Sequence, residues 1–204
     1  MKKSYLIIGG IALLIIIAIG SYASTYNKAV SLQEEVDAQW GNVNNTYQRR
    51  LDLIPNLVKA VNKAVEAEKE TFTEVSRARS GLPSTKELTS LKEDIKKAKD
   101  PAVLEKLEKT LKGYEKSTQN FLNVAVERYP VLKSMDNLKG FQAQLEGTEN
   151  RINKARDDYN GSVKSYNTHI RGFFSSMILN KEEFPKKSAF KAEAGAEKGV
   201  DIDM

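Results

Sequence analysis

An unbroken apolar run near the amino terminus is the feature that most limits the folds open to this chain. Residues 5–23 contain no charged side chain, and Tyr5 and Tyr22 lie near its two ends. At ~1.5 Å rise per residue, a helix of this length is about as long as the ~30 Å hydrocarbon core of a bilayer is thick. A soluble fold would have to bury such a helix on every side. We therefore expect a transmembrane helix over residues 5–23, after a short basic amino terminus over residues 1–4.

A cleavable signal peptide is the competing interpretation of the same run. A basic start, an apolar stretch and the small residues Ser21 and Ala23 also fit a secretory signal that is cleaved after Ala23. Against cleavage, the apolar run is somewhat long, and the helical pattern continues into the following residues without a turn. We expect an uncleaved anchor. The alternative is a secreted or periplasmic helical binding module that begins at Ser24.

The orientation of the anchor depends on a small difference in basic residues. Lys2 and Lys3 precede the apolar run, whereas Lys28 alone follows it closely. Because basic residues are retained on the cytoplasmic side of a membrane, the count favours a cytoplasmic amino terminus and a body outside the cytoplasm. Both orientations stay open on so small a difference.

The charge of the chain is balanced along its length. The net charge is +5, and Lys2 and Lys3 supply two of these charges. Basic and acidic residues are interspersed elsewhere, without the basic run or face that is typical of nucleic-acid binding. The chain contains no cysteine, which excludes disulfides and zinc–thiolate sites. We expect a solvated surface of mixed charge and no nucleic-acid partner.

Apolar residues after the anchor recur every three or four positions, which predicts long amphipathic helices. The first is expected to run on from the anchor to about Arg79. Pro55 removes one backbone hydrogen bond inside the pattern, so we expect a kink or a break near Leu51. The apolar positions of this helix are Val36, Trp40, Val43, Tyr47, Leu51, Ile54, Val58, Val61, Val65, Phe72 and Val75.

A glycine- and proline-containing loop over residues 80–84 separates this helix from a shorter, lysine-rich one. Ser84 or Thr85 is expected to cap the short helix, which reads helical over residues 85–99. Asp100 and Pro101 then form a strong start for the next helix, with Asp as the cap and Pro at the first helical position. Its apolar stripe is Leu104, Leu107, Leu111, Tyr114, Phe121, Val124 and Ala125, and it is expected to end near Arg128.

The last long helix has the most regular pattern. Asp136 is expected to cap it, and its apolar residues follow a heptad seam for about five heptads. Residues 176–204 are poor in large apolar side chains, so we expect a loosely ordered tail there. The seam consists of Leu138, Phe141, Leu145, Thr148, Ile152, Ala155, Tyr159, Val163, Tyr166, Ile170 and Phe173.

These patterns together predict an all-α protein. The expected architecture is an amino-terminal transmembrane helix followed by a long antiparallel bundle of three to four helices over residues 24–175. No segment alternates with the period of two that indicates a strand. A single amphipathic helix cannot bury its apolar face alone, so the stripes must meet one another.

Two blocks of sequence resemble the LemA family. The first is Trp40 followed by residues 47–58, which read YQRRLDLIPNLV. The second contains residues 129–133, residues 144–152, which read QLEGTENRI, and then Ala155-Arg156, Tyr159-Asn160 and Tyr166-Asn167. The likeness covers residues 20–175, although this chain has Phe173-Phe174 where the family usually has Phe-Pro.

The resemblance implies a bacterial protein of the cytoplasmic (inner) membrane, with an uncleaved single-pass anchor and a long antiparallel bundle. The family has no established catalytic activity. Some members resemble components of magnetosome membranes, and others are encoded beside membrane metalloproteases. The resemblance therefore implies work in the cell envelope, with a membrane metalloprotease among the partners to consider.

No arrangement of residues in the sequence points to catalysis. His169 is the single histidine, and a zinc site without cysteine would normally need at least two. We expect His169 to be a solvated helix residue. The sequence also lacks a glycine-rich phosphate loop and a nucleophile elbow. We therefore expect no enzyme and no catalytic, metal or cofactor site.

Polar residues within the two LemA-like blocks are the candidate interaction site. Arg49 and Asp52 are three residues apart, and Asp52 and Asn56 are four apart, so all three share a helix face. A similar stripe on the last helix could face them and form arginine–carboxylate pairs across the bundle. Such residues form either a structural network around Pro55, which we favour, or a docking surface. They are Arg49, Arg50, Asp52, Asn56, Glu149, Asn150, Arg151, Arg156 and Asn160.

The function expected from the sequence is a membrane-anchored, non-enzymatic scaffold or adaptor of the bacterial cell envelope. Its partners would be the lipid bilayer, through residues 5–23, and unknown membrane or envelope proteins. A second alternative is a homo-oligomer that shapes a membrane. An unpaired apolar stripe on the middle helix would favour that alternative.

Overall fold

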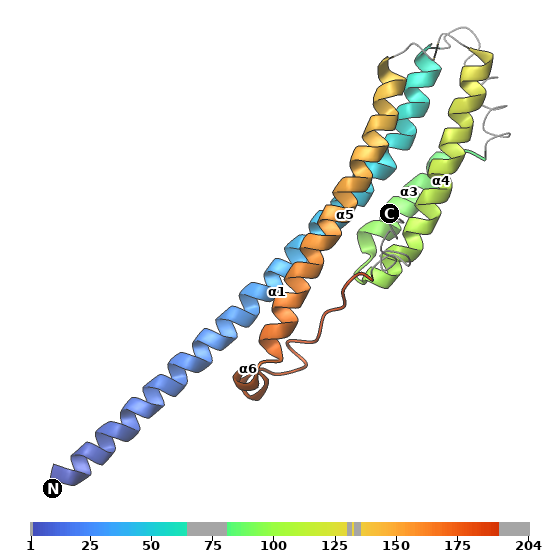
Figure 1. Cartoon of the computed structure of the whole chain (residues 1–204). Coiled ribbons are helices and arrows are strands. Elements are labelled where there is room, and N and C mark those ends of the chain that lie inside the picture. Colours follow the sequence, from blue (N-terminus) through green and yellow to red (C-terminus); the bar gives the residue numbers. More distant parts are fainter. Residues whose placement is uncertain (1, 65–80, 130–131, 133–135, 192–204) are drawn as a thin grey trace, which may run out of the picture. The chain divides into compact units, whose positions relative to one another are not determined.

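The computed structural model describes residues 2–64, 81–129, 132 and 136–191 (Figure 1). Within these ranges every regular element is a helix and no strand occurs, which confirms the all-α prediction. The chain divides into two compact units, and α1 and α5 contribute residues to both. The first unit holds residues 1–40 and 158–189, and the second holds residues 41–157 and 190–204. The helices are α1 (Lys2–Ala64), α3 (Thr85–Lys97), α4 (Pro101–Arg128), α5 (Asp136–Ile170) and α6 (Phe173–Ile178).

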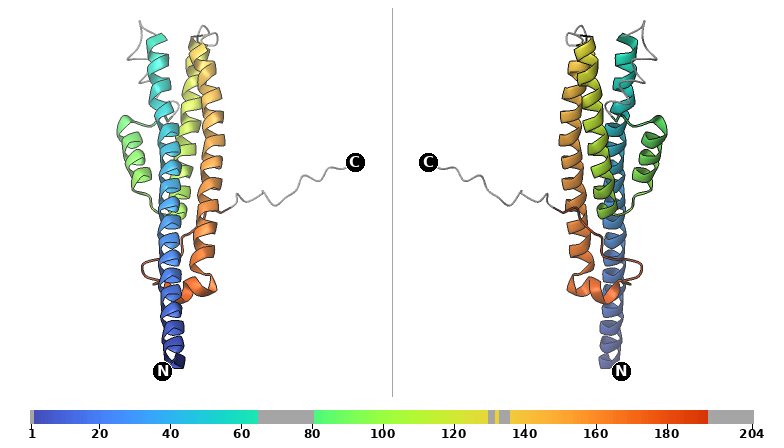
Figure 2. Two further views of the ribbon diagram at one scale, coloured as in Figure 1. Left: turned by 90° about the vertical axis from the view of Figure 1, so that its left-hand side faces the viewer. Right: turned by 90° about the vertical axis from the view of Figure 1, so that its right-hand side faces the viewer.

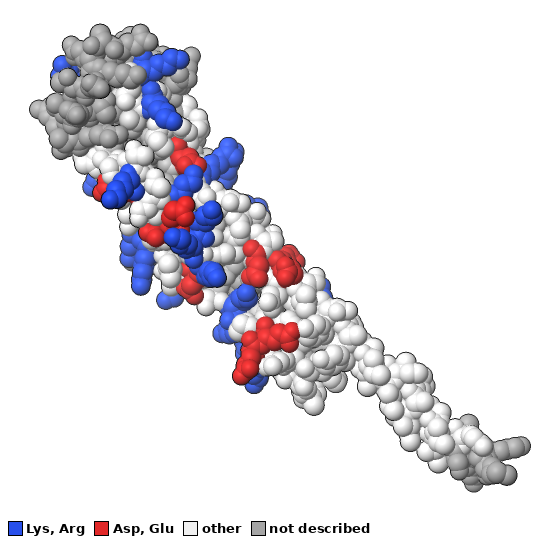
Figure 3. All heavy atoms as spheres, turned by 180° about the vertical axis from the view of Figure 1, so that it is seen from behind, with Lys and Arg blue, Asp and Glu red and all other residues white. Residues whose placement is uncertain are grey.

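The amino-terminal part of α1 exposes its apolar side chains. Between residues 5 and 22, the large apolar side chains that the structure describes are exposed by between 52% and 72%. In the described part of the chain, one helix is long and apolar enough to cross a membrane by length and composition, and this stretch belongs to it. On the face shown in Figure 3, acidic and basic side chains are interspersed over the rest of the described surface, and none lies along the described apolar stretch.

The middle of α1 was expected to kink or break near Leu51. The helix continues through Pro55, so the break is absent. Leu51, Ile54 and Val58 are all buried, and this packing holds the helix although proline removes one backbone hydrogen bond. The expected end near Arg79 lies outside the described residues.

The starts of α3 and α4 are where the sequence placed them. The hydroxyl of Ser84 accepts a hydrogen bond from the amide of Glu87, and the carboxylate of Glu87 accepts one from the amide of Ser84 at 2.7 Å, which is a capping box. The Asp100 carboxylate accepts from the amide of Ala102 at 2.8 Å, with Pro101 at the first position of α4. Both local predictions are confirmed.

The second unit contains the main core. α3 and α4 contact each other and run in opposite directions, joined by a short loop (Figure 1). In both views of Figure 2, part of α1 is seen between them. The apolar stripes of α1, α3, α4 and α5 supply the buried side chains of this unit. Among them are Val43, Leu51, Ile54, Val61, Leu91, Ile95, Leu104, Leu111, Phe121, Ala125 and Ile152.

In the first unit, α1 and α5 run antiparallel. The rings of Trp40 and Tyr159 lie 5.1 Å apart, and Nε2 of His169 lies 3.0 Å from the carbonyl oxygen of Thr25. A carbonyl oxygen can only accept, so Nε2 carries the proton in this contact. The prediction of a solvated His169 was therefore wrong, because the ring is half-buried against α1.

The seam of α5 ends earlier than the sequence indicated. Thr148, Ile152, Tyr159 and Tyr166 are buried as expected, but α5 stops at Ile170 and the side chain of Phe173 is exposed on α6. The side chains of Leu138 and Phe141 lie outside the described residues.

The segment after α6 packs against α5, in contrast to the loose tail expected from residue 176. Leu179 and Phe184 are buried. The Tyr166 hydroxyl donates to the carbonyl of Pro185 at 3.0 Å, and the Asn167 amide donates to the carbonyl of Lys187 at 2.9 Å. These side chains satisfy backbone groups that a short irregular segment cannot pair by itself. Residues 192–204 lie outside the described residues.

Candidate functional site

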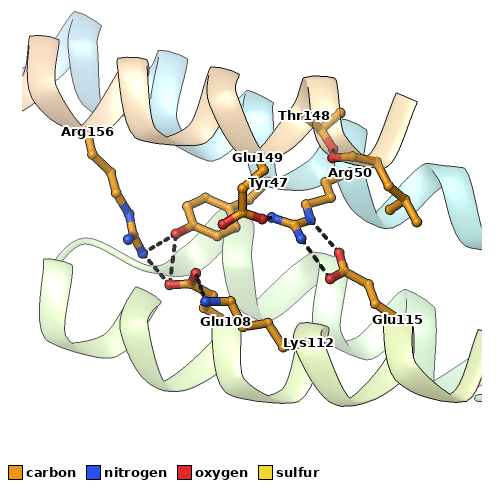
Figure 4. A network of polar contacts seen from close by, with 9 residues as sticks. Tyr47, Arg50, Glu108, Lys112, Glu115, Thr148, Glu149 and Arg156 are labelled. Atoms are coloured by element: carbon orange, nitrogen blue, oxygen red, sulfur yellow. Dashed lines mark hydrogen bonds and ion pairs between the residues drawn. The ribbon is translucent and has the colours of Figure 1, made fainter. Parts of the chain in front are cut away.

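Arg50 joins three helices of the second unit. Its side chain is 7% exposed. Nη2 donates to one carboxylate oxygen of Glu115 on α4 at 2.8 Å, and Nε donates to the other (Figure 4). Nη1 donates to Glu149 on α5. The two-pronged pairing with Glu115 is the geometry in which arginine–carboxylate bonds are strongest.

A second cluster lies one heptad away along α4 and α5. Arg156 on α5 donates to both the Tyr47 hydroxyl and the carboxylate of Glu108 on α4. Tyr47 in turn donates to the same carboxylate at 3.2 Å, and Nζ of Lys112 lies 3.2 Å from its other oxygen. The Arg156 guanidinium also lies over the ring of Phe190 at 4.9 Å. The buried carboxylate of Glu108 is therefore surrounded by donors (Figure 4).

We call the two clusters together the polar network. They fix the register of α1, α4 and α5, that is, how far each helix is shifted along its axis relative to the others. The acids on α4 are seven residues apart, as are Glu149 and Arg156 on α5, so each pair stands two turns apart on one helix face. The order of the contacts shows that α4 runs parallel to α1 in this unit, and α5 antiparallel. A shift of one helix by a single turn would leave buried charges without partners, which costs several kcal/mol each.

Burial and pairing set the protonation of the network. Burial alone would lower the pKa of Arg50, but its bonds to Glu115 and the nearby acids raise that pKa overall. Burial would likewise raise the pKa of Glu108, but Arg156 and Lys112 hold it below its usual value. Burial raises the pKa of Glu115 and of Tyr47 above their usual values. Tyr47 therefore stays a neutral donor at ordinary pH.

The predicted site residues divide into three environments. The structure brings Arg50, Glu149 and Arg156 into the polar network, so arginine–carboxylate pairs do cross the bundle. Asp52 instead pairs with Lys92 of α3 at 2.7 Å. The remaining predicted residues lie outside the network: Arg49, Asn56, Asn150 and Arg151 are exposed, and Asn160 is half-buried in the first unit.

Sequence reasoning missed Glu108 and Glu115 and took Tyr47 for a purely apolar core residue. A signal was available for the two acids. Each lies four residues after a buried leucine of α4, Leu104 or Leu111, and therefore on the buried face of that helix. Among the described residues, no group of three or more histidine or acidic side chains is arranged to hold a metal ion.

A groove of about 250 Å³ lies on the second unit between α1 and α5. It brings together the two LemA-like blocks, because one wall comes from each. Two exposed arginines border it, and none of the lining residues that the structure describes is acidic. The lining residues are Arg49, Leu53, Ala143, Gln144, Gly147, Thr148 and Arg151.

Comparison with known proteins agrees with the motifs. The sequence model of the LemA family matches residues 39–204. The chain is 30% identical over 154 residues to magnetosome proteins MamQ 1 and MamQ 2 of Paramagnetospirillum magneticum, and 28% identical to magnetosome protein MamQ of Magnetospirillum gryphiswaldense. The aligned part is 71% of this chain but 57% of each relative, so the chain spans little more than half their length. With the family match extending over the groove and the whole polar network, this protein belongs to the LemA family.

Proposed function

We propose that this protein is a membrane-anchored, non-enzymatic adaptor of the bacterial cell envelope, which holds a helical bundle at the bilayer and docks an acidic segment of another envelope protein. The observation that carries the anchoring is the exposed apolar stretch of α1. Exposed apolar surface of this extent is unfavourable in water and favourable in hydrocarbon. Tyr5 and Tyr22 stand at the two ends of the stretch, where aromatic side chains favour the membrane interface.

The docking part of the proposal rests on the groove between α1 and α5. Arg49 and Arg151 are exposed at its border, and the described lining contains no acid to neutralise them. An arginine guanidinium binds carboxylates through two parallel hydrogen bonds. A segment that contains glutamate or aspartate, and a small apolar side chain to contact Leu53, would therefore fit the groove. Arg50 cannot meet such a partner, because the polar network buries it.

The described part of α4 gives no support to the membrane-shaping oligomer. Its apolar stripe is buried at Leu104, Leu111 and Phe121. An unpaired stripe on this helix is the feature that would have favoured self-assembly. We therefore propose the adaptor alone.

Site-specific photo-crosslinking in intact cells tests the docking. A photoreactive amino acid replaces Gln144 in the groove or, as a matched control, the exposed Asn120 on α4. We expect a protein adduct at position 144 that is absent at 120, and whose crosslinked peptide, identified by mass spectrometry, is rich in acidic residues. The double substitution Arg49→Glu with Arg151→Glu should abolish that adduct. The same adducts at both positions, or an adduct unaffected by the charge reversal, would contradict the proposal.

A further inference from the structure

The short helix α6 presents large apolar side chains to solvent. Phe173, Phe174 and Met177 are 74%, 74% and 75% exposed, more than any other large apolar side chain that the structure describes. The opposite side of α6 faces inward, since Ser175 is buried. The two phenylalanine rings lie edge to face, 5.3 Å apart. Folding of the first unit gains nothing from this apolar surface, so another environment must cover it.

Contacts within the first unit place α6 beside the end of the apolar stretch of α1. His169, four residues before α6, contacts the carbonyl of Thr25 at 3.0 Å. Phe184, six residues after α6, packs edge-on against the ring of Tyr26 at 5.4 Å, and Tyr26 stacks on Tyr22 at 6.2 Å. Thr25 lies two residues, or about 3 Å along the helix, beyond the end of the apolar stretch. The segments on both sides of α6 are therefore held near the end of the apolar stretch, and α6 lies between them.

Basic residues flank the same side. A pocket of about 380 Å³ next to α6 is lined by Arg171, Lys181 and Lys186, and by no acidic residue. Two exposed acids, Glu182 and Glu183, lie in the same segment, and Glu183 accepts a hydrogen bond from the Tyr26 hydroxyl. Apolar side chains beside cations are the arrangement with which interfacial helices bind anionic lipid surfaces.

We propose that α6 is a second membrane contact, in which Phe173, Phe174 and Met177 enter the interfacial layer of the leaflet next to Tyr22, and the flanking cations hold anionic headgroups. The inference rests on the proposed anchoring of α1. Because the anchor already holds α6 at the bilayer, its insertion is intramolecular, and six residues suffice. Two contacts with one leaflet would fix the tilt of the first unit against the membrane. A second copy of this chain fits less well, because it would have to bring acids to the three cations.

Spin-label depth measurements on the full chain in proteoliposomes of phosphatidylethanolamine and phosphatidylglycerol test this contact. The chain has no cysteine, so single thiols can be introduced by Phe173→Cys on α6, Ile15→Cys in the anchor and Asn120→Cys on α4. We expect the labels at 15 and 173 to be accessible to oxygen and shielded from a water-soluble nickel chelate, with 173 the shallower. The label at 120 should show the reverse. Adding Phe174→Ser and Met177→Ser should return the label at 173 to water, whereas Val103→Ser, a substitution of an exposed apolar residue on α4, should not.

The labels separate failure of this inference from failure of the anchor. A label at 173 in water while the label at 15 is in lipid would overturn the second contact and leave the anchor in place. Both labels in water would overturn both. Spin–spin coupling at 173 that grows with the protein-to-lipid ratio would assign the surface to a second copy instead. Replacing phosphatidylglycerol by phosphatidylcholine should shift the label at 173 toward water, and no shift would overturn the role of the cations.

Discussion

Arg49 and Arg50 are neighbours in the chain but lie in different environments. Successive helix residues point about 100° apart, so Arg50 faces α4 and α5 while Arg49 borders the groove. The sequence grouped them because both belong to the same motif. It could not separate them, since the acids that neutralise Arg50 lie 65 and 99 positions away. The same distance hid Glu108, which in isolation looks like any acid on a lysine-rich helix.

Removing Arg50 should destabilise the bundle far more than removing its neighbour. Arg50→Ala leaves the carboxylate of Glu115, whose side chain is 13% exposed, without its partner, and breaking a largely buried pair in this way costs about 3–5 kcal/mol. Arg49→Ala changes an exposed side chain and should stay within about 0.5 kcal/mol of the wild type. Guanidinium unfolding of the full chain in detergent, followed by far-UV circular dichroism, measures both. Equal losses for the two variants would mean that the polar network does not hold the helices together.

Glu108 and Glu115 should change the free energy of unfolding in opposite directions as the pH changes. Although burial acts to raise it, the pKa of Glu108 is held low by Arg156 and Lys112, so its contribution is present above the ordinary carboxyl pKa and lost as the pH falls through the lowered value. Burial raises the pKa of Glu115, so its contribution is present at low pH and lost as the pH rises through the raised value.

The measurement is the free energy of unfolding of the full chain in detergent at a series of acidic pH values. The slope against pH is compared rather than the absolute stability, because each substitution also removes an ion pair. Glu108→Gln should flatten the loss of stability on acidification, and Glu115→Gln should steepen it. A change of slope in the same direction for both variants would contradict these protonation states.

At the scale of the helices, the sequence predicted the features that depend on residues close together in the chain, and not those that depend on distant packing. Ser84 and Asp100 act on amides two or three residues away, so the starts of α3 and α4 were readable from sequence. Pro55 was expected to kink or break α1, but distant packing keeps the helix continuous. The exposure of Phe173 likewise depends on where α5 ends, since the heptad pattern alone extends across it.

The capping box predicts a local effect at the start of α3. Ser84→Ala removes the side-chain acceptor for the Glu87 amide and should cost about 1 kcal/mol. Hydrogen exchange of the amides in the first turn of α3 should become faster. Thr89→Ala is the matched control, because the Thr89 hydroxyl only donates back to the carbonyl of Thr85 within the helix. If the two variants exchange alike, the box does not hold the start of this helix.

At the scale of the whole molecule, the sequence predicted the class of fold, but it did not predict the groove or the pocket beside α6. The charge-free run and the helical periods are properties of continuous segments, so the long apolar helix and the packed helices could be predicted. The groove combines residues of α1 and α5 that only folding brings together, and the pocket beside α6 depends on the conformation of residues 170–186. The LemA-like blocks contain residues of both the polar network and the groove, but the sequence could not tell the two sets apart.

The proposed anchoring is tested most directly by the fate of the apolar stretch in native membranes. Membranes from cells that express the chain are washed with alkaline carbonate, and the intact mass of the recovered protein is measured. We expect the protein in the membrane pellet, with a mass that includes residues 5–23. If the protein is recovered in the carbonate supernatant and begins at Ser24, the proposed membrane anchoring is wrong.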